Sequence, residues 1–286
     1  MIRSIALPRV WVACPVCGSD DAVTVLREIV GDAHRVYARE CPLDVQGGEA
    51  LVRCRCCGMA YINPQPRLPA NLASYPPSEE TAYFAATRQE RVGGAEHLLA
   101  LLEQRLGSRG RLFDIGCGDG ALLSVALERG WQADGIEASA SLVAQLDANG
   151  LVEHVQLGRA EALAGDDARY DAVVLLNVLE HTLEPAAVLG EAVRVLRPGG
   201  LLAVHVPNYA WGRLWGRRWH QLQPLEHKHY FAPRTLHRLL VRVGLMPLAR
   251  FGLPPASPAR ARLQRFLAAF GLWPGSGLGM LATRRR

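Results

Sequence analysis

Residues 113–120 read Phe113-Asp114-Ile115-Gly116-Cys117-Gly118-Asp119-Gly120, an apolar strand end followed by three alternating glycines. Glycine lets the backbone approach a ligand closely, and the free N–H groups at the start of the next helix favour a carboxylate or a phosphate. Glu137 ends the next expected strand, where a carboxylate can bind both hydroxyls of a ribose. The stretch therefore predicts an adenosine-like ligand at the carboxyl edge of a sheet.

The residues around this loop alternate between short apolar runs and amphipathic ones. We expect helices at residues 96–106, 120–129, 140–148, 185–196 and 233–243, and strands at 111–115, 132–136, 152–157, 170–176, 201–206, 245–250 and 278–283. Runs such as Ala172-Val-Val-Leu-Leu176 are apolar throughout, as a sheet covered on both faces requires. The pattern predicts a doubly wound α/β fold.

The composition excludes disordered and fibrous proteins, because 49% of the 286 residues are hydrophobic and no glycine or proline repeat is present. The net charge of +5 is unevenly distributed, since residues 201–286 hold fourteen basic residues and one acid, Glu226. This basic third indicates an anionic partner: a phosphorylated small molecule, a membrane surface or a nucleic acid. The alternative is an arginine-rich genome, because Lys228 is the only lysine.

Two C-x2-C pairs lie in the first 68 residues, Cys14-Pro-Val-Cys17-Gly18 and Cys54-Arg-Cys56-Cys57-Gly58. Four thiolates complete a tetrahedral zinc site with no open position, so Cys14, Cys17, Cys54 and Cys57 predict a structural zinc ion. Cys56 remains an alternative to Cys54 or Cys57, and Cys41 is spare. The competing interpretation is a set of unligated buried thiols.

The chain divides by composition into three parts. We expect a small zinc-ribbon-like module at residues 1–68, a proline-rich linker and lid segment at 69–94, and the α/β domain at 95–286, with substrate insertions near 207–232 and 252–275. No stretch reads as a secretion signal and no apolar run is long enough to span a bilayer, so we expect a cytoplasmic protein.

The glycine loop alone leaves two ligands open, because Gly116-x-Gly118-x-x-Ala121 also satisfies the dinucleotide fingerprint. Asp114 helps to separate them. An acid at the end of the strand would repel a pyrophosphate, but it suits a ligand that carries an ammonium group and a sulfonium. This favours S-adenosylmethionine over NAD.

The ordered motifs resemble class I S-adenosylmethionine-dependent methyltransferases over residues 95–251. They are Asp114-x-Gly-x-Gly-x-Gly120, Gly135-Ile-Glu137, Tyr170-Asp171, Asn177-Val-Leu-Glu-His181 and Leu196-Arg-Pro-Gly-Gly200. The cysteine pairs and Asn63-Pro64 look like bacterial methyltransferases with an N-terminal zinc-binding segment. The resemblance implies a Rossmann-like, mostly parallel sheet with an antiparallel last strand.

The resemblance also implies cofactor contacts. Asp114 and Gly116 would hold the methionine end, with Cys117, Gly118 and Gly120 in the same loop; Glu137 would bind the ribose, Ala160 and Glu161 the adenine edge, and Asn177 the methionyl ammonium. Many relatives have an acidic residue two positions before Glu161, where this chain has Arg159. Tyr83 and Phe84 are either a lid over the cofactor or plain packing on the sheet.

His181 is our candidate general base, with Glu180 beside it, because an oxygen or carbon nucleophile must lose a proton. The alternative is that both residues only cap a turn. Glu180 and His181 also resemble the end of the Glu-x-x-Glu-His pattern of some metal-dependent O-methyltransferases. In this chain Asn177 replaces the first Glu of that pattern. His229 is a further catalytic candidate, in a loop cluster with His220, His227 and Tyr230.

Tryptophans recur every four residues among arginines, at Trp211, Trp215 and Trp219. On a helix this spacing predicts one aromatic stripe. The stripe could contact a substrate, a membrane or a nucleic acid. Core packing is the alternative. Residues 259–273 are basic and then apolar, which indicates peripheral membrane contact.

The leading function is methyl transfer to oxygen or carbon of a small molecule: a quinone precursor, a natural product or a nucleotide-linked sugar. An RNA methyltransferase and a non-catalytic adenosine-binding scaffold are the alternatives.

Overall fold

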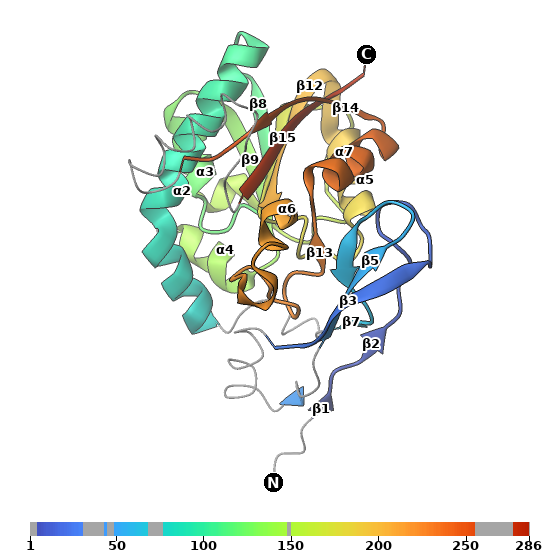
Figure 1. Ribbon diagram of the computed structural model, residues 1–286. Helices are drawn as coiled ribbons and strands as arrows, with labels where there is room; N and C mark the ends of the chain where they lie inside the picture. The colour runs from blue at the N-terminus through green and yellow to red at the C-terminus, as the bar shows by residue number, and fades with distance from the viewer. Residues whose placement is uncertain are drawn as a thin grey trace.

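A seven-stranded sheet forms the centre of the molecule (Figure 1). The computed structural model describes residues 5–30, 43–44, 49–67, 77–147, 150–254 and 277–285. The strand order is β10-β9-β8-β11-β12-β15-β14, and every pair is parallel except those made by β15, which is antiparallel to both neighbours. The expected mostly parallel sheet with an antiparallel last strand is therefore confirmed.

The strands of this sheet match the apolar runs in the sequence. They are β8 (Arg111–Ile115), β9 (Gln132–Glu137), β10 (Val155–Leu157), β11 (Tyr170–Leu176), β12 (Leu196–Pro207), β14 (Leu245–Phe251) and β15 (Gly277–Arg284). Side chains in the middle of β11 and β12 are buried, because helices cover both faces of the sheet.

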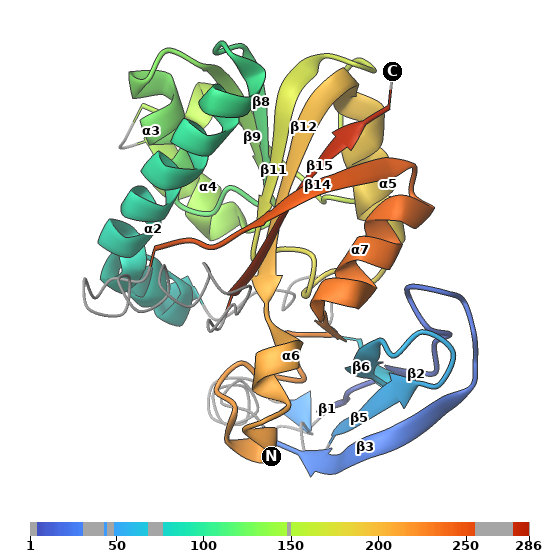
Figure 2. The same cartoon turned by 45° about the horizontal axis from the view of Figure 1, so that its top comes forward.

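Helices α2, α3 and α4 lie on one side of the sheet, and α5 and α7 lie on the other (Figure 2). The helices are α2 (Pro77–Leu106), α3 (Ala121–Glu128), α4 (Ala140–Leu146), α5 (Pro185–Val195), α6 (Tyr209–Gly212) and α7 (Pro233–Arg242), with short 3-10 turns η3 (Val152–His154) and η4 (Gly216–Arg218). The doubly wound architecture is confirmed.

The N-terminal module lies near the end of β12 and is built of short strands (Figure 2). They are β1 (Ile5–Ala6), β2 (Arg9–Val10), β3 (Ala22–Ile29), β4 (Leu43–Asp44), β5 (Glu49–Cys54), β6 (Ala60–Ile62) and β7 (Gln65–Pro66). Strand β13 (His229–Tyr230), from the far end of the chain, pairs with β6 and completes a four-stranded sheet with β5 and β3. The module and the 207–232 loop are therefore one structural unit.

Helix α7 also holds the module. Arg238 donates to the carbonyl oxygen of Cys57 at 3.0 Å, and Arg242 donates to that of Val16 at 2.7 Å. One continuous hydrophobic core includes Met59 and Tyr61 of the module together with side chains of β11, β12, α5 and α7. The module is packed onto the sheet domain rather than tethered to it.

Three local expectations were wrong. The first helix begins at Pro77 rather than at residue 96, and it passes residue 94 without interruption. Residues 152–154 form a 3-10 turn, so only 155–157 form the strand. The tryptophan segment is not one helix, because the chain leaves α6 after Gly212 and Gly216 adopts a φ of +53°.

The tryptophans consequently do not form one stripe. Trp219 is buried against Tyr209 and Tyr230, with ring centroids 5.9 Å from each, while Trp211 and Trp215 are exposed. Cys41, most of the expected 252–275 insertion and the 259–273 segment lie outside the described residues. Among the described helices, none has the length and apolar character to cross a bilayer.

Candidate functional site

The glycine loop between β8 and α3 has a backbone that only glycine adopts readily. Gly116, Gly118 and Gly120 have φ values of +73°, +58° and +74°. A Cβ atom on Gly118 would overlap the ring of Phe84, and one on Gly116 would overlap Val178. The three glycines are therefore required both by the turn and by close neighbours.

Two carboxylates lie beneath this loop, one buried and one partly buried. Asp114 is 3% exposed within β8, and Glu137 ends the neighbouring strand β9. Burial, and after it the negative charge of Glu137, raises the pKa of Asp114 to about 7. Burial likewise raises the pKa of Glu137. The arrangement concentrates negative charge where a cationic ligand would be stabilised.

Glu137 is held in place by two backbone N–H groups. Gly118 donates to one carboxylate oxygen at 2.9 Å, and Ser139 donates to the other at 2.8 Å. Each oxygen keeps a second lone pair, which can accept from a hydroxyl. Gly158 donates to the Glu137 carbonyl at 2.9 Å, so the loop with Ala160 and Glu161 begins beside this carboxylate.

The first half of α2 covers the loop. Glu80 accepts from the hydroxyls of Ser139 at 2.6 Å and Ser141 at 2.8 Å, both at the start of α4. Arg88 and Arg91 bind the carboxylate of Asp119 at 2.8 and 2.6 Å. The Arg91 guanidinium also lies 4.4 Å from the centre of the Phe84 ring.

A second polar group joins two residues that follow β11, the neighbour of β8, to one residue from the loop after β12. Ligand atoms of Glu180, His181 and His227 all lie within 4.8 Å of one another. Glu180 is 1% exposed, and burial raises the pKa of its carboxyl to about 8. The rings of His181 and His227 meet edge to face, with centroids 4.7 Å apart.

The two imidazoles of this group favour their neutral form. Burial lowers the pKa of His227 to about 4. Desolvation by the surrounding protein, and after it the nearby His227 and Lys228, hold the pKa of His181 well below its ordinary value. The His181 side chain is still 40% exposed, so it can meet a ligand from solvent.

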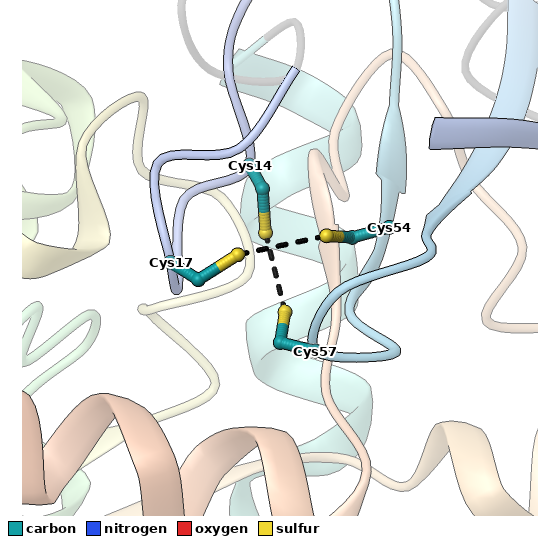
Figure 3. Close-up of side chains that lie close together, drawn as sticks. All are labelled: Cys14, Cys17, Cys54 and Cys57. Atoms are coloured by element: carbon teal, nitrogen blue, oxygen red, sulfur yellow. Dashed lines mark hydrogen bonds between the residues drawn. The ribbon is translucent and has the colours of Figure 1, made fainter. Parts of the chain in front are cut away.

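The four predicted cysteines converge in the N-terminal module (Figure 3). The sulfur of Cys14 lies 3.4 Å from that of Cys57, and the sulfur of Cys17 lies 3.6 Å from that of Cys54. Tetrahedral zinc with Zn–S bonds of about 2.3 Å separates its sulfurs by about 3.8 Å. The cluster therefore fits zinc, and Cys56 is exposed outside it.

A family model described as "Methyltransferase domain" matches residues 84–249, which is more than half of the chain. The chain belongs to this methyltransferase family. The match begins at Phe84 and contains the glycine loop, Asp114, Glu137 and the Glu180–His181–His227 group.

Curated relatives are methyltransferases too. A ubiquinone biosynthesis O-methyltransferase of Cereibacter sphaeroides is 33% identical over 155 residues, which is 50% of this chain and 63% of that protein. Another, from a Bradyrhizobium species, is 35% identical over 104 residues, or 35% and 41% of the two chains. The aligned region thus spans less than two thirds of these relatives.

Solved methyltransferase structures share the fold. A chain from the complex between the Haloferax volcanii Trm112 methyltransferase activator and a methyltransferase aligns with a TM-score of 0.56 at 16% identity, covering 73% of this chain and 97% of the other. A methyltransferase of Thermotoga maritima aligns with a TM-score of 0.52 at 19% identity, covering 73% and 96%.

The methyltransferase fold gathers most of the expected cofactor residues at one sheet edge. Asp114, the loop residues Gly116 to Gly120 and Glu137 lie together at this edge, with Cys117 buried within the loop. Asn177 follows the adjacent strand with a φ of +55°, and its side-chain oxygen lies 3.0 Å from Nδ1 of His205. Glu161 forms an ion pair with Arg159 at 3.5 Å.

The structure brings two of the three catalytic candidates together and leaves the third outside their group. His181 and Glu180 are adjacent, with His181 Nε2 3.9 Å from a Glu180 oxygen. His229 is 2% exposed in strand β13 and is not a member of the three-residue group, so its catalytic role stays a prediction. His227 joins the group instead. The dipeptide Glu226-His227 in the loop after β12 was the available signal, but nothing in the sequence separated His227 from His229.

Proposed function

We propose that this protein transfers the methyl group of S-adenosylmethionine to an oxygen or carbon atom of a small-molecule acceptor. The observation that carries the proposal is the pair of carboxylates under the glycine loop, buried Asp114 and partly buried Glu137, with Gly116 of that loop packed against Val178, two residues before Glu180. Together they provide a site for a cationic adenosine ligand next to groups able to activate an acceptor.

Asp114 and Glu137 divide the binding of the donor. Asp114 supplies negative charge near the methionine end, while Glu137 has lone pairs left for the ribose hydroxyls. Asn177, Ala160 and Glu161 are proposed for the ammonium and the adenine, at the ends of the two flanking strands. S-adenosylmethionine supplies a methyl group on a sulfonium, which is already an activated leaving group.

The α2 cover is proposed to exclude water from the donor. Because Phe84 lies against Gly118, its ring must shift for a ligand to approach the loop. Glu80, Arg88 and Arg91 hold the helix over the site through contacts with α4 and Asp119. Exclusion of water and alignment of the acceptor supply much of the rate enhancement for an in-line displacement.

The Glu180–His181–His227 group is proposed to prepare the acceptor. The acceptor hydroxyl or acidic carbon loses its proton, the resulting electron pair forms the bond to the methyl carbon, and the carbon–sulfur electron pair returns to sulfur. Neutral His181, which is partly exposed, can receive the proton. The names of the relatives support an oxygen acceptor among quinone precursors.

The cysteine cluster is proposed to hold structural zinc. Four thiolates leave no coordination position for a substrate, so the ion would connect the two turns of the module without taking part in methyl transfer.

The proposal is tested by incubating the protein with labelled S-adenosylmethionine and a panel of quinone precursors. We expect label in an O-methylated product, and His181→Gln should lower kcat by about 100-fold or more while leaving donor binding intact. His237→Gln, an exposed change on α7, is the matched control. Donor binding without transfer to any acceptor would instead favour the non-catalytic scaffold.

A further inference from the structure

We propose that Glu180, His181 and His227 form a binding site for a divalent transition-metal cation, distinct from the cysteine cluster. Each side chain offers one ligand atom, and these atoms lie within 4.8 Å of one another. A carboxylate and two imidazoles at this spacing can bind one face of a metal ion.

Glu180 is the first reason for a cation. Its carboxyl group is 1% exposed, and in the part of the chain that the structure describes neither oxygen has a hydrogen-bond partner. Burying an unpaired polar group is costly, and such a group calls for a partner. A cation between Glu180 and the two imidazoles would provide it.

His227 is the second and independent reason. Its Nδ1 lies 2.8 Å from the carbonyl oxygen of Gln221, and a carbonyl can only accept. Nδ1 therefore carries the hydrogen, and Nε2 keeps its lone pair. A metal-binding histidine commonly donates its other ring N–H to a backbone carbonyl in this way, which orients the ring.

The exposure of His181 indicates an open site. Its side chain is 40% exposed while Glu180 and His227 are buried, so coordination positions remain on the side facing solvent. Three protein ligands with open positions are typical of a catalytic site, whereas the cysteine cluster is closed. Two imidazole ligands favour zinc, iron, nickel or copper over magnesium, calcium or manganese.

Lys228 adjoins His227 in the chain and carries a charge of the same sign as the proposed cation. Its Nζ is directed to the carbonyl oxygens of Leu225 and Glu226, and its backbone N–H donates to the Glu180 carbonyl at 2.7 Å. The side chain is therefore anchored within its own loop. A cation would connect the end of β11 to this loop, and so to strand β13 and the N-terminal module.

The use of the cation rests on the proposed function. Beside the acceptor, it would lower the pKa of a bound hydroxyl, whose proton would pass to solvent. With the cation bound, His181 would use its lone pair as a ligand, so the cation would replace His181 in activating the acceptor. The binding site itself does not depend on methyl transfer, so the two proposals can fail separately.

The test is a titration with Co²⁺ of the full chain, purified with zinc in the cysteine cluster and dialysed to remove weakly bound metal. We expect one Co²⁺ per chain, with visible bands of nitrogen and oxygen ligation and no sulfur-to-cobalt charge-transfer band. Glu180→Gln and His227→Gln should each weaken binding at least tenfold, while His237→Gln should not change it.

Several outcomes would overturn the site. The first is that the parent chain takes up no Co²⁺, and the second is that uptake gives only thiolate bands. The third is that Glu180→Gln and His227→Gln both bind Co²⁺ with the affinity of the parent. Circular dichroism and S-adenosylmethionine binding check that each variant folds; if Glu180→Gln does not, His227→Gln and the parent spectrum decide. Methyl transfer without Co²⁺ binding would contradict this inference alone, and Co²⁺ binding without methyl transfer would contradict the proposed function alone.

Discussion

Asp114 is the residue at which stability and ligand binding are in conflict. Its carboxyl group is 3% exposed, and its pKa is raised to about 7 by burial and by Glu137. The folded chain therefore binds this proton more tightly than the unfolded chain, and the unliganded protein loses stability as the pH rises from about 4 to 7. Only the ionised form, however, attracts a cationic donor.

Asp114→Asn is expected to separate these effects. The variant should be more stable than the parent by at least about 1 kcal/mol at pH 8 without ligand, because no buried charge forms. It should bind S-adenosylmethionine weakly at every pH, whereas affinity of the parent should fall about tenfold from pH 8 to pH 6. Thermal denaturation and isothermal titration measure both, and a parent affinity that does not change with pH would contradict the role of Asp114.

Gly118 tests the cover over the loop. Gly118→Ala places a methyl group against Phe84 and imposes a φ of +58° on alanine, so we expect loss of stability and at least tenfold weaker donor binding. Gly107→Ala is the matched control, because Gly107 also has a positive φ, of +74°, but has open space around it. Equal donor affinity in the two variants would show that the contact with Phe84 is unimportant.

Sequence patterns predicted the strands better than the ends of the helices. Apolar runs such as 170–176 must be buried on both faces, so their burial decides their structure. The first half of α2 is largely polar and lacks a clear apolar face; the contacts of Glu80 and Arg91 with distant residues hold it in place. The tryptophan spacing suggested a helix, but Gly212 and Gly216 end it.

The cysteine turns are expected to stabilise more than their own module. Because Arg238 and Arg242 of α7 bind the Cys57 and Val16 carbonyls, loss of zinc should loosen the packing of the module on the sheet domain. Cys57→Ser is expected to lower Tm in a single transition and to reduce bound zinc. Cys56→Ser, at the exposed neighbouring thiol, is the control. Two separated unfolding transitions would argue that the module folds independently.

The charge of the whole molecule has a partly structural explanation. Arg217 donates to the carbonyls of Arg27 and Glu28, and Arg284 donates to those of Val193, Arg194 and Leu196. With Arg238 and Arg242, several basic residues of the last third thus bind backbone oxygens. The uneven charge in the sequence could not show whether these basic residues bind backbone carbonyls or form a surface for an anionic partner.

Salt dependence is expected to separate a small acceptor from RNA. In fluorescence anisotropy with a labelled single-stranded RNA, we expect no saturable binding between about 50 and 200 mM salt. Tight binding at low salt that weakens by about 1,000-fold over this range would instead indicate many phosphate contacts and favour an RNA acceptor.

The most direct measurement is a crystal structure with S-adenosylhomocysteine bound. We expect the ribose hydroxyls on the Glu137 carboxylate, the methionine ammonium on the side of Asp114 and Asn177, and the sulfur facing the Glu180–His181–His227 group. A sulfur directed away from that group, or a ribose bound elsewhere, would contradict the proposed site of methyl transfer.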